Sequence, residues 1–196
     1  MGYPEDFEAL ETIEQSIWRQ LRRAVKDRRS PGHTPTVASI GPDGAPRQRT
    51  VVLRGCDVEA RTLMFHTDAR SPKWQQLGAD PRVAMHFYFP KPKLQYRVQG
   101  IAQLEHGTPA TQAKWDSMNS SARDCYRVQT APGTPIPAPR SRKQETARAL
   151  GGYPAFARIH VQVASIDWLY LAAVGHRRAQ FVWAEDGSVT QRWVAP

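Results

Sequence analysis

The chain has 196 residues, with 27 lysines and arginines against 18 aspartates and glutamates, so its formal charge is +9. Hydrophobic residues make up 40% of it, which is enough to build a buried core and excludes a disordered chain. No apolar run reaches the roughly 20 residues that cross a bilayer, and the acidic start differs from a secretory signal. We therefore expect a cytoplasmic protein without a membrane partner, folded as one domain over residues 1–196.

The two cysteines and the excess of bases limit the kinds of ligand. Cys56 and Cys125 lie far apart and lack CxxC spacing, so the sequence indicates neither a disulfide scaffold nor a metal site. The positive charge suits phosphorylated small molecules, anionic lipid or nucleic acid. The densest basic run, at 19–29, ends a predicted helix, where bases complement the helix dipole; a polyanion-binding patch is the alternative.

Apolar spacings of three and four predict an N-terminal helix over residues 5–27. Segments rich in β-branched residues then predict strands at 34–40, 47–54, 62–67, 82–89 and 95–104. A serine and proline followed by Gly78 predict a short helix from Ser71, and Thr108-Pro109 predicts another to about Met118.

The proline-rich segment 119–142 predicts a long loop, of the kind that covers or binds a ligand in compact domains; a linker is the alternative. Closing strands follow within 156–194, at 156–163 and 167–171 and as a hairpin of 180–184 with 188–194 around Asp186-Gly187. The pattern predicts a mainly β (α+β) fold: an antiparallel, closed or partly closed barrel with peripheral helices.

Two places suggest binding of an anion. Strand 47–54 carries arginine on both faces, which is costly unless each arginine meets an anion or solvent. The Ser71 helix begins with a hydroxyl, free backbone N–H groups and Lys73 in its first turn, which together can hold a phosphate; plain helix capping is the alternative. Glycine-rich nucleotide loops, the GxSxG hydrolase motif and the HExxH zinc motif are absent.

Five segments in this order resemble the pyridoxamine 5'-phosphate oxidase family of FMN-binding split barrels. They are RTVVLRGCD at 49–57, FHT at 65–67, SPK at 71–73, DPRVA at 80–84 and LQYRVQG at 94–100. The resemblance runs from about residue 34 to 105. It implies an antiparallel split β-barrel that forms a homodimer and binds FMN between the two subunits. It also implies hydride transfer from an amine-bearing carbon to the flavin, which oxygen then regenerates.

By position, the resemblance assigns eight residues to the cofactor and no catalytic residue. The FMN phosphate is assigned to Arg49, Ser71 and Lys73, and the flavin ring to Thr50, Val51, Val52, Thr67 and Gln95.

Departures from the family pattern gather on the substrate side. Arg54 replaces a lysine, and Pro72 replaces an arginine that helps to hold phosphate. The family's Arg-x-His-x-Arg becomes HRRAQ at 176–180, so the substrate histidine and arginine are exchanged. We expect Arg54, His176 and Arg178 to form a cationic wall for a small anionic or phosphorylated substrate.

Three functions are compatible with these residues. The first is an FMN-dependent oxidoreductase of this family, and the second is a flavin-binding protein that has lost turnover. The third is a basic nucleic-acid-binding barrel, with aromatic residues interleaved among bases. The sequence argues against the third, because it carries no known nucleic-acid-binding motif and a phosphorylated cofactor already uses several cations.

Overall fold

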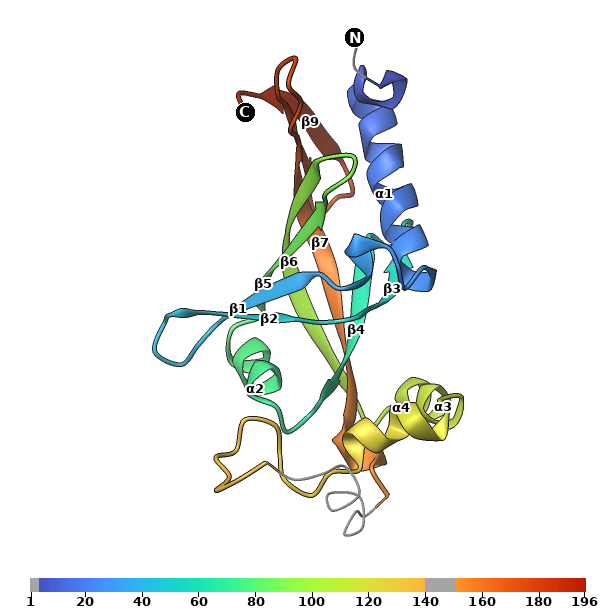
Figure 1. The fold of residues 1–196 in the computed structure, drawn as a ribbon, viewed down its shortest axis with the longest axis vertical. Coiled ribbons are helices and arrows are strands. Elements are labelled where there is room, and N and C mark those ends of the chain that lie inside the picture. Colours follow the sequence, from blue (N-terminus) through green and yellow to red (C-terminus); the bar gives the residue numbers. More distant parts are fainter. Residues whose placement is uncertain (1–3, 140–150) are drawn as a thin grey trace.

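The computed structural model describes residues 4–139 and 151–196, which form one sheet with helices packed around it (Figure 1). The strands are β1 Thr36–Ile40, β2 Pro46–Thr50, β3 Leu53–Asp57, β4 Thr62–Asp68, β5 Arg82–Phe89, β6 Leu94–His106, β7 Phe156–Tyr170, β8 Arg177–Trp183 and β9 Val189–Val194. The α-helices are α1 Leu10–Lys26, α2 Pro72–Ala79, α3 Pro109–Asp116 and α4 Ser120–Arg123. No described helix has the length and apolarity to span a bilayer.

Each strand pairs antiparallel with its neighbours, in the order β2-β1-β5-β6-β7-β4-β3, and β8 and β9 extend from β7. The long strands β6 and β7 link two parts of the sheet, since β7 pairs with β4 through its first half and with β8 through its second half. The path ends at β2 and β3, which do not pair with each other, so the sheet stays open there.

The predicted single strand 47–54 is wrong. The chain forms β2 and β3 instead, separated at Val51 and Val52. The reason is the pairing: β2 lies along β1 at one end of the sheet, and β3 lies along β4 at the other end. The two-residue crossing therefore carries the chain from one edge of the sheet to the other.

Helix α1 covers one face of the sheet, and Ile13, Ile17 and Leu21 are fully buried against it. The helix predicted over 5–27 is interrupted, because a short 3-10 helix, Glu5–Phe7, precedes α1. Phe7 leaves the α-helical path and packs edge-on against Trp168, with ring centroids 5.2 Å apart. Burial of this aromatic ring accounts for the break.

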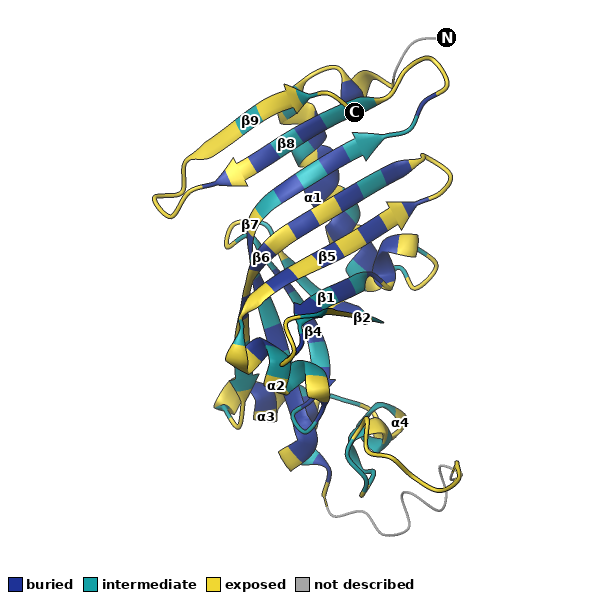
Figure 2. Ribbon diagram, turned by 90° about the vertical axis from the view of Figure 1, so that its left-hand side faces the viewer, coloured by how far each residue is buried: buried dark blue, intermediate teal, exposed yellow. Residues whose placement is uncertain are grey.

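The opposite face of the strands β5 to β8 is not covered by any described helix, and we call it the open face (Figure 2). Because side chains alternate between the two faces of a strand, every second residue of β5 to β8 lies on the open face. These residues include Arg82, Ala84, His86, Tyr88, Gln95, Arg97, Gln99, Ile101, Ser165, Asp167, Leu169, Arg178, Gln180 and Val182. Tyr88, Ile101 and Val182 are among the large apolar side chains that remain exposed in the single chain. A face of this composition is suited to burial by another molecule.

The segment 119–142 is more ordered than the predicted loop, although residues 140–142 lie outside the described part. It contains α4 and the 3-10 helix Asp124–Tyr126. The Asn119 side chain accepts from the Ala122 N–H at 2.9 Å, which caps α4. The Arg123 guanidinium donates to the backbone carbonyls of Trp115 and Asp116 at the end of α3, so this arginine has a structural partner.

Glu105 near the end of β6 is held by three donors. Its carboxylate accepts from Arg158 at 2.7 Å, from the Thr108 hydroxyl at 2.7 Å and from a ring nitrogen of His160 at 2.8 Å. Burial alone would raise the pKa of Glu105, but these hydrogen bonds outweigh it and lower the pKa to about 2. The charged form of Glu105 therefore stabilises the folded state above the ordinary pKa of a glutamate.

Replacing Glu105 with glutamine tests this contribution. Because the folded pKa lies below the unfolded one, the stabilisation is fully present above pH 4.5 and is lost as the pH falls towards 2. We expect Glu105→Gln to lower the free energy of unfolding at pH 7 by up to about 3 kcal/mol, and to make its decline between pH 4.5 and 2 shallower. Urea titrations at several pH values measure both effects. The exposed Glu59→Gln serves as control, and equal acid profiles for wild type and Glu105→Gln would contradict the assignment.

Candidate functional site

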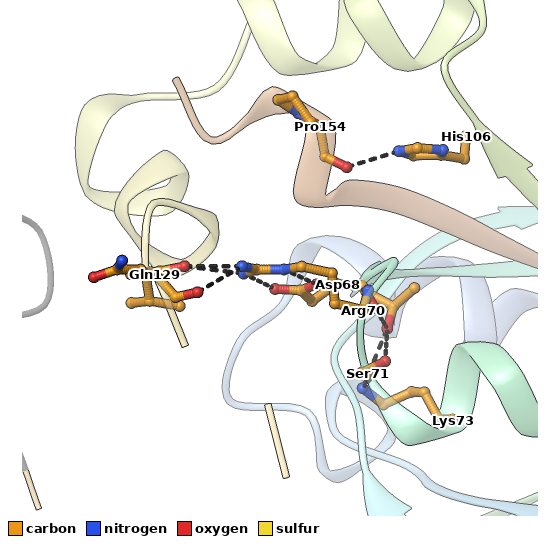
Figure 3. Close-up of polar contacts among 9 residues, drawn as sticks. Asp68, Arg70, Ser71, Lys73, His106, Gln129 and Pro154 are labelled. Carbon is orange, nitrogen blue, oxygen red and sulfur yellow. Dashed lines mark hydrogen bonds and ion pairs between the residues drawn. The ribbon is translucent and has the colours of Figure 1, made fainter. Parts of the chain in front are cut away.

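One group of polar residues lies where β4 turns into α2. The Lys73 ammonium donates to the Thr67 hydroxyl at 3.2 Å and to the Ser71 hydroxyl at 3.4 Å, and the two hydroxyls are 3.1 Å apart (Figure 3). Ser71 occupies the N-cap position of α2, but its side chain makes no capping hydrogen bond. Thr67 and Ser71 are buried. The capping alternative therefore does not account for the Ser71 hydroxyl, which faces the lysine.

Arg49 on β2 lies beside this group. Its guanidinium donates to the Ser39 hydroxyl and to the Gln76 side-chain oxygen, each at 2.7 Å. Gln76 and Lys73 lie three residues apart on α2, so the guanidinium held by Gln76 lies on the side of the helix that carries Lys73. Burial lowers the pKa of Lys73 and the positive charge of Arg49 lowers it further, while the Asp68 carboxylate acts in the opposite direction. Burial also lowers the pKa of Arg49.

No carboxylate in the described part of the chain lies within ion-pair distance of Arg49 or Lys73, whereas nearby Arg70 pairs with Asp68 at 2.7 Å. The Asp68 carboxylate acts on Lys73 only from a distance and is already paired with Arg70, so two partly buried cations remain that an anion bound beside them would stabilise. Two hydroxyls and the positive end of α2 face the same place. These groups fit a phosphate monoester, the end group by which FMN would be held.

The residues predicted to line the flavin ring lie in two separate places in the single chain. Val51 is buried and Val52 partly buried at the crossing between β2 and β3, with exposed Thr50 just before them, so these three adjoin Arg49. Gln95 lies on the open face at the start of β6, where it pairs with Tyr88 of β5. Arg49 of β2 pairs with Val37 of β1, and both side chains lie on the other face of the sheet. One chain therefore brings together every predicted cofactor residue except Gln95.

The predicted substrate side contains Arg54 and an aromatic cluster. His66 and Tyr126 both pack edge-on against Phe156, with ring centroids 5.0 and 5.1 Å away. Burial, followed by the positive charges of Arg54, Lys114 and Arg158, lowers the pKa of His66 to about 3. The lowered pKa favours the neutral imidazole of His66 at physiological pH.

Tyr126 was not predicted from the sequence. Burial raises its pKa to about 12, and it is within electrostatic reach of Arg54. Its phenol therefore stays protonated and can donate a hydrogen bond at neutral pH. An aromatic residue in a segment expected to be an irregular loop gives no periodic signal, which explains the omission.

The other two members of the predicted substrate wall lie far from Arg54 in the same chain. Arg178 on β8 donates to both oxygens of Asp167, at 3.1 and 2.8 Å, and His176 is exposed in the preceding turn. Arg54 lies level with Ile159 on β7, whereas Arg178 pairs with Leu169, so roughly 30 Å of strand separates them. A single chain does not assemble the predicted wall.

Arg70 fastens the segment after α4 to the candidate phosphate site (Figure 3). Its guanidinium donates to the buried carboxylate of Asp68 and also to the backbone carbonyls of Val128 and Gln129. Further along this segment Gly133 has a φ of +87°, and a Cβ there would lie 3.0 Å from a ring carbon of Pro72. Pro72, which stands where the family has an arginine, therefore packs against the chain instead of binding phosphate.

The chain is similar in sequence to several known proteins. Residues 15–106 match the family model described as pyridoxamine 5'-phosphate oxidase, FMN-binding domain. A pyridoxine/pyridoxamine 5'-phosphate oxidase of Chromobacterium violaceum is 36% identical over 99 residues, which are 50% of this chain and 45% of that protein. Pyridoxine/pyridoxamine 5'-phosphate oxidase 2 of Arabidopsis thaliana is 28% identical over 79% of this chain and 83% of its own length.

Two solved structures share the fold. A pyridoxamine 5'-phosphate oxidase-related, FMN-binding protein of Nostoc punctiforme superposes with a TM-score of 0.75 at 24% identity, covering 93% of this chain and 96% of its own. PhzG of Burkholderia lata, solved with tetrahydrophenazine-1-carboxylic acid, gives a TM-score of 0.78 at 17% identity, covering 100% and 98%. The predicted antiparallel split β-barrel is confirmed.

The match of residues 15–106 to an FMN-binding domain assigns FMN as the cofactor, and the side chains around Lys73 and Arg49 fit the phosphate of that cofactor. Residues 15–106 are similar to the FMN-binding domain of pyridoxamine 5'-phosphate oxidase, and the match to the Chromobacterium violaceum relative spans less than half of that protein's length.

Proposed function

We propose that this protein is an FMN-dependent oxidoreductase that acts on a small anionic or phosphorylated substrate. The observation that carries the proposal is the pair of cations Arg49 and Lys73, which have no ion-pair partner among the described residues and lie beside the Ser71 and Thr67 hydroxyls in an FMN-binding domain. Bound FMN supplies the electron-accepting chemistry. The described residues would bind its phosphate, line its ring and orient the substrate, which is the larger part of what such a site needs from the protein.

The substrate class follows from the charges around Arg54. This exposed arginine, Lys114 and Arg158 all act on His66, and of these Arg158 is neutralised by Glu105. The Tyr126 phenol supplies a nearby neutral donor. A carboxylate or phosphate would be attracted to these positive charges, and pairing with the Arg54 guanidinium would orient it as well as bind it.

Anaerobic reduction of the bound flavin tests this function. The purified protein is mixed in a stopped-flow instrument with anionic amines and alcohols and with their neutral analogues, and the flavin absorbance is followed. Bleaching by anionic donors, slowed by Arg54→Ala, supports the proposal. A flavin that binds but is bleached by none of the donors would favour the non-catalytic alternative, and the absence of any flavin would reject both.

We also propose a single FMN-binding domain over residues 1–196. The strands β7, β8 and β9 continue the sheet that begins within residues 15–106, and β7 pairs with β6 along almost its whole length. We place the protein in the cytoplasm, because its two cysteines lack the spacing of a disulfide scaffold of the kind common in exported proteins.

We propose that the working form is a homodimer joined through the open face. This face carries Gln95, and a groove in it is lined by Ala84, Ile101 and Ala164 among others. Within one chain, the predicted substrate wall is divided by roughly 30 Å of β7. A second copy on the open face would supply Arg178, His176 and Gln95 to the site that its partner leaves incomplete.

Ile101→Arg tests the position of the interface. Ile101 is 45% exposed in the single chain, and a charge placed there would have to be desolvated in the dimer. We expect wild type to sediment as a dimer and Ile101→Arg as a monomer at micromolar concentration, with weaker FMN binding. Gln15→Arg, exposed on α1 across the sheet, is the control. A monomeric wild type would refute the dimer, and a dimeric Ile101→Arg would move the interface elsewhere.

A further inference from the structure

Arg49 is held by two neutral side chains from two other elements. Ser39 comes from β1 and Gln76 from α2, and the Ser39 hydroxyl also donates to the Gln76 oxygen at 2.8 Å. One terminal nitrogen of Arg49 donates to Ser39 and the other to Gln76, each at 2.7 Å. The three side chains therefore form a closed ring of hydrogen bonds.

The chemistry of the ring fixes its orientation. Arginine only donates hydrogen bonds, so the Gln76 atom that faces it must be the amide oxygen. Ser39 is 2% exposed and Gln76 is partly buried, so neither side chain moves freely in solvent. The ring thus sets the plane of the guanidinium relative to α2.

The ring uses one edge of the guanidinium and leaves another edge available. Nη1 donates to Ser39 and, at 3.4 Å, to the Val37 carbonyl, and Nη2 gives one hydrogen to Gln76. Within the described residues nothing accepts from Nε or from the second Nη2 hydrogen. Those two parallel N–H groups form the fork that binds two oxygens of a phosphate.

The partners' neutrality matters as much as their position. A carboxylate at residue 76 could make the same contacts, and it would cancel the arginine charge before any phosphate arrived. Gln76 also lies three residues after Lys73, so both project from the same side of α2. One helix therefore carries a phosphate-binding cation and the neutral group that holds the other cation.

We propose that Gln76, assisted by Ser39, is a positioning residue that presents the charged fork of Arg49 to the FMN phosphate and thereby favours FMN over riboflavin. This inference rests on the assignment of Arg49 and Lys73 to the phosphate. Gln76 acts through Arg49 and touches no reacting atom.

The test compares FMN with riboflavin, which lacks the phosphate, by quenching of flavin fluorescence. Gln76→Glu keeps the shape and the acceptor but neutralises Arg49, so we expect FMN affinity to fall at least about tenfold. Gln76→Ala removes the positioning alone, and we expect a loss of about three- to tenfold. Riboflavin affinity stays within about twofold in both variants, since the hydrogen bonds concerned are absent from its complex. The salt dependence of FMN binding becomes shallower in Gln76→Glu.

Gln75→Glu is the matched control, because it adds the same charge to the exposed neighbouring position. We expect it to change FMN affinity by less than about twofold. Thermal unfolding of each variant shows whether it folds. If Gln76→Glu does not fold, Ser39→Ala tests the positioning of Arg49 instead, with the loss of FMN affinity and the unchanged riboflavin affinity expected of Gln76→Ala, and an unchanged FMN affinity in Ser39→Ala would contradict the inference.

Three results would overturn the inference. FMN affinity unchanged in Gln76→Glu would show that the charge of Arg49 is not needed. Equal losses for FMN and riboflavin would show a merely structural role. A wild type that binds FMN no more tightly than riboflavin would reject the phosphate site itself, whereas the first two results leave the part of that site formed by Lys73, Ser71 and Thr67 in place.

Discussion

Lys73→Ala is expected to weaken FMN binding by about 1.5–3 kcal/mol, which is roughly a 10- to 150-fold higher Kd. The lysine is partly buried, donates to two hydroxyls and lies beside a second cation without a carboxylate partner among the described residues. Its removal takes away a charge-assisted hydrogen bond to the phosphate. Arg49→Ala is expected to cost a comparable amount, since its free fork would contact the same group. Titration with FMN, followed by flavin fluorescence, measures both.

Two comparisons make this result specific. Lys91→Ala removes an exposed lysine from the turn between β5 and β6, and we expect no change in FMN affinity. Riboflavin binding by Lys73→Ala should equal that of wild type. If FMN binds equally well to wild type, Lys73→Ala and Arg49→Ala, the phosphate site lies elsewhere in the protein.

The sequence predicts the local part of this site well. Thr67, Ser71 and Lys73 lie within seven residues, so a strand that turns into a helix is enough to bring their side chains together. Arg49 joins them only because β1 pairs with both β2 and β5, which brings β2 beside α2. The placement of Arg49 in the phosphate site was predicted from the resemblance to a known family. It could not be predicted from the alternation of side chains along strand 47–54, because that segment divides into β2 and β3.

Residues that act through other residues were not predicted. Ser39 is a polar side chain in a buried series of β1, and Gln76 falls at an ordinary position of a short helix, so neither stands out by its type or spacing. Their role depends on three elements that meet around Arg49. The break before α1 has a similar cause, because Phe7 packs on Trp168, which is distant in the sequence.

The residues of the substrate side were harder to predict, because the sequence does not show how far apart two strands' residues lie along the sheet. Arg54 and Arg178 resemble two parts of one site, yet β7 separates them by roughly 30 Å in a single chain. The sequence also does not reveal that Arg178 is paired with Asp167. Burial would raise the pKa of Asp167, but hydrogen bonds from Arg178, Arg97 and Gln180 outweigh it and lower the pKa. Arg178 therefore belongs to an ion-pair cluster on the open face.

Oxidation of pyridoxamine 5'-phosphate is expected to be weak or absent, with kcat/KM below roughly 10⁴ M⁻¹s⁻¹. The exchange of histidine and arginine within 176–180 moves the arginine fork by two residues, which is about 6–7 Å along a strand. A displacement of that size prevents the same ligand from binding in the same pose. The Asp167 carboxylate also disfavours binding of this substrate. Arg178 donates to both oxygens of Asp167 and would have to break these hydrogen bonds to bind a substrate phosphate.

The measurement is the rate of product formation from pyridoxamine 5'-phosphate by the FMN-loaded protein, with an authentic pyridoxamine 5'-phosphate oxidase assayed beside it. An anionic donor of different length should reduce the flavin faster than pyridoxamine 5'-phosphate does, because Arg54 and the Tyr126 phenol remain in place to receive its charge. Turnover of pyridoxamine 5'-phosphate above roughly 10⁴ M⁻¹s⁻¹ would mean that Arg178 leaves Asp167 in the working enzyme, and that the exchanged residues bind the ordinary substrate of the family after all.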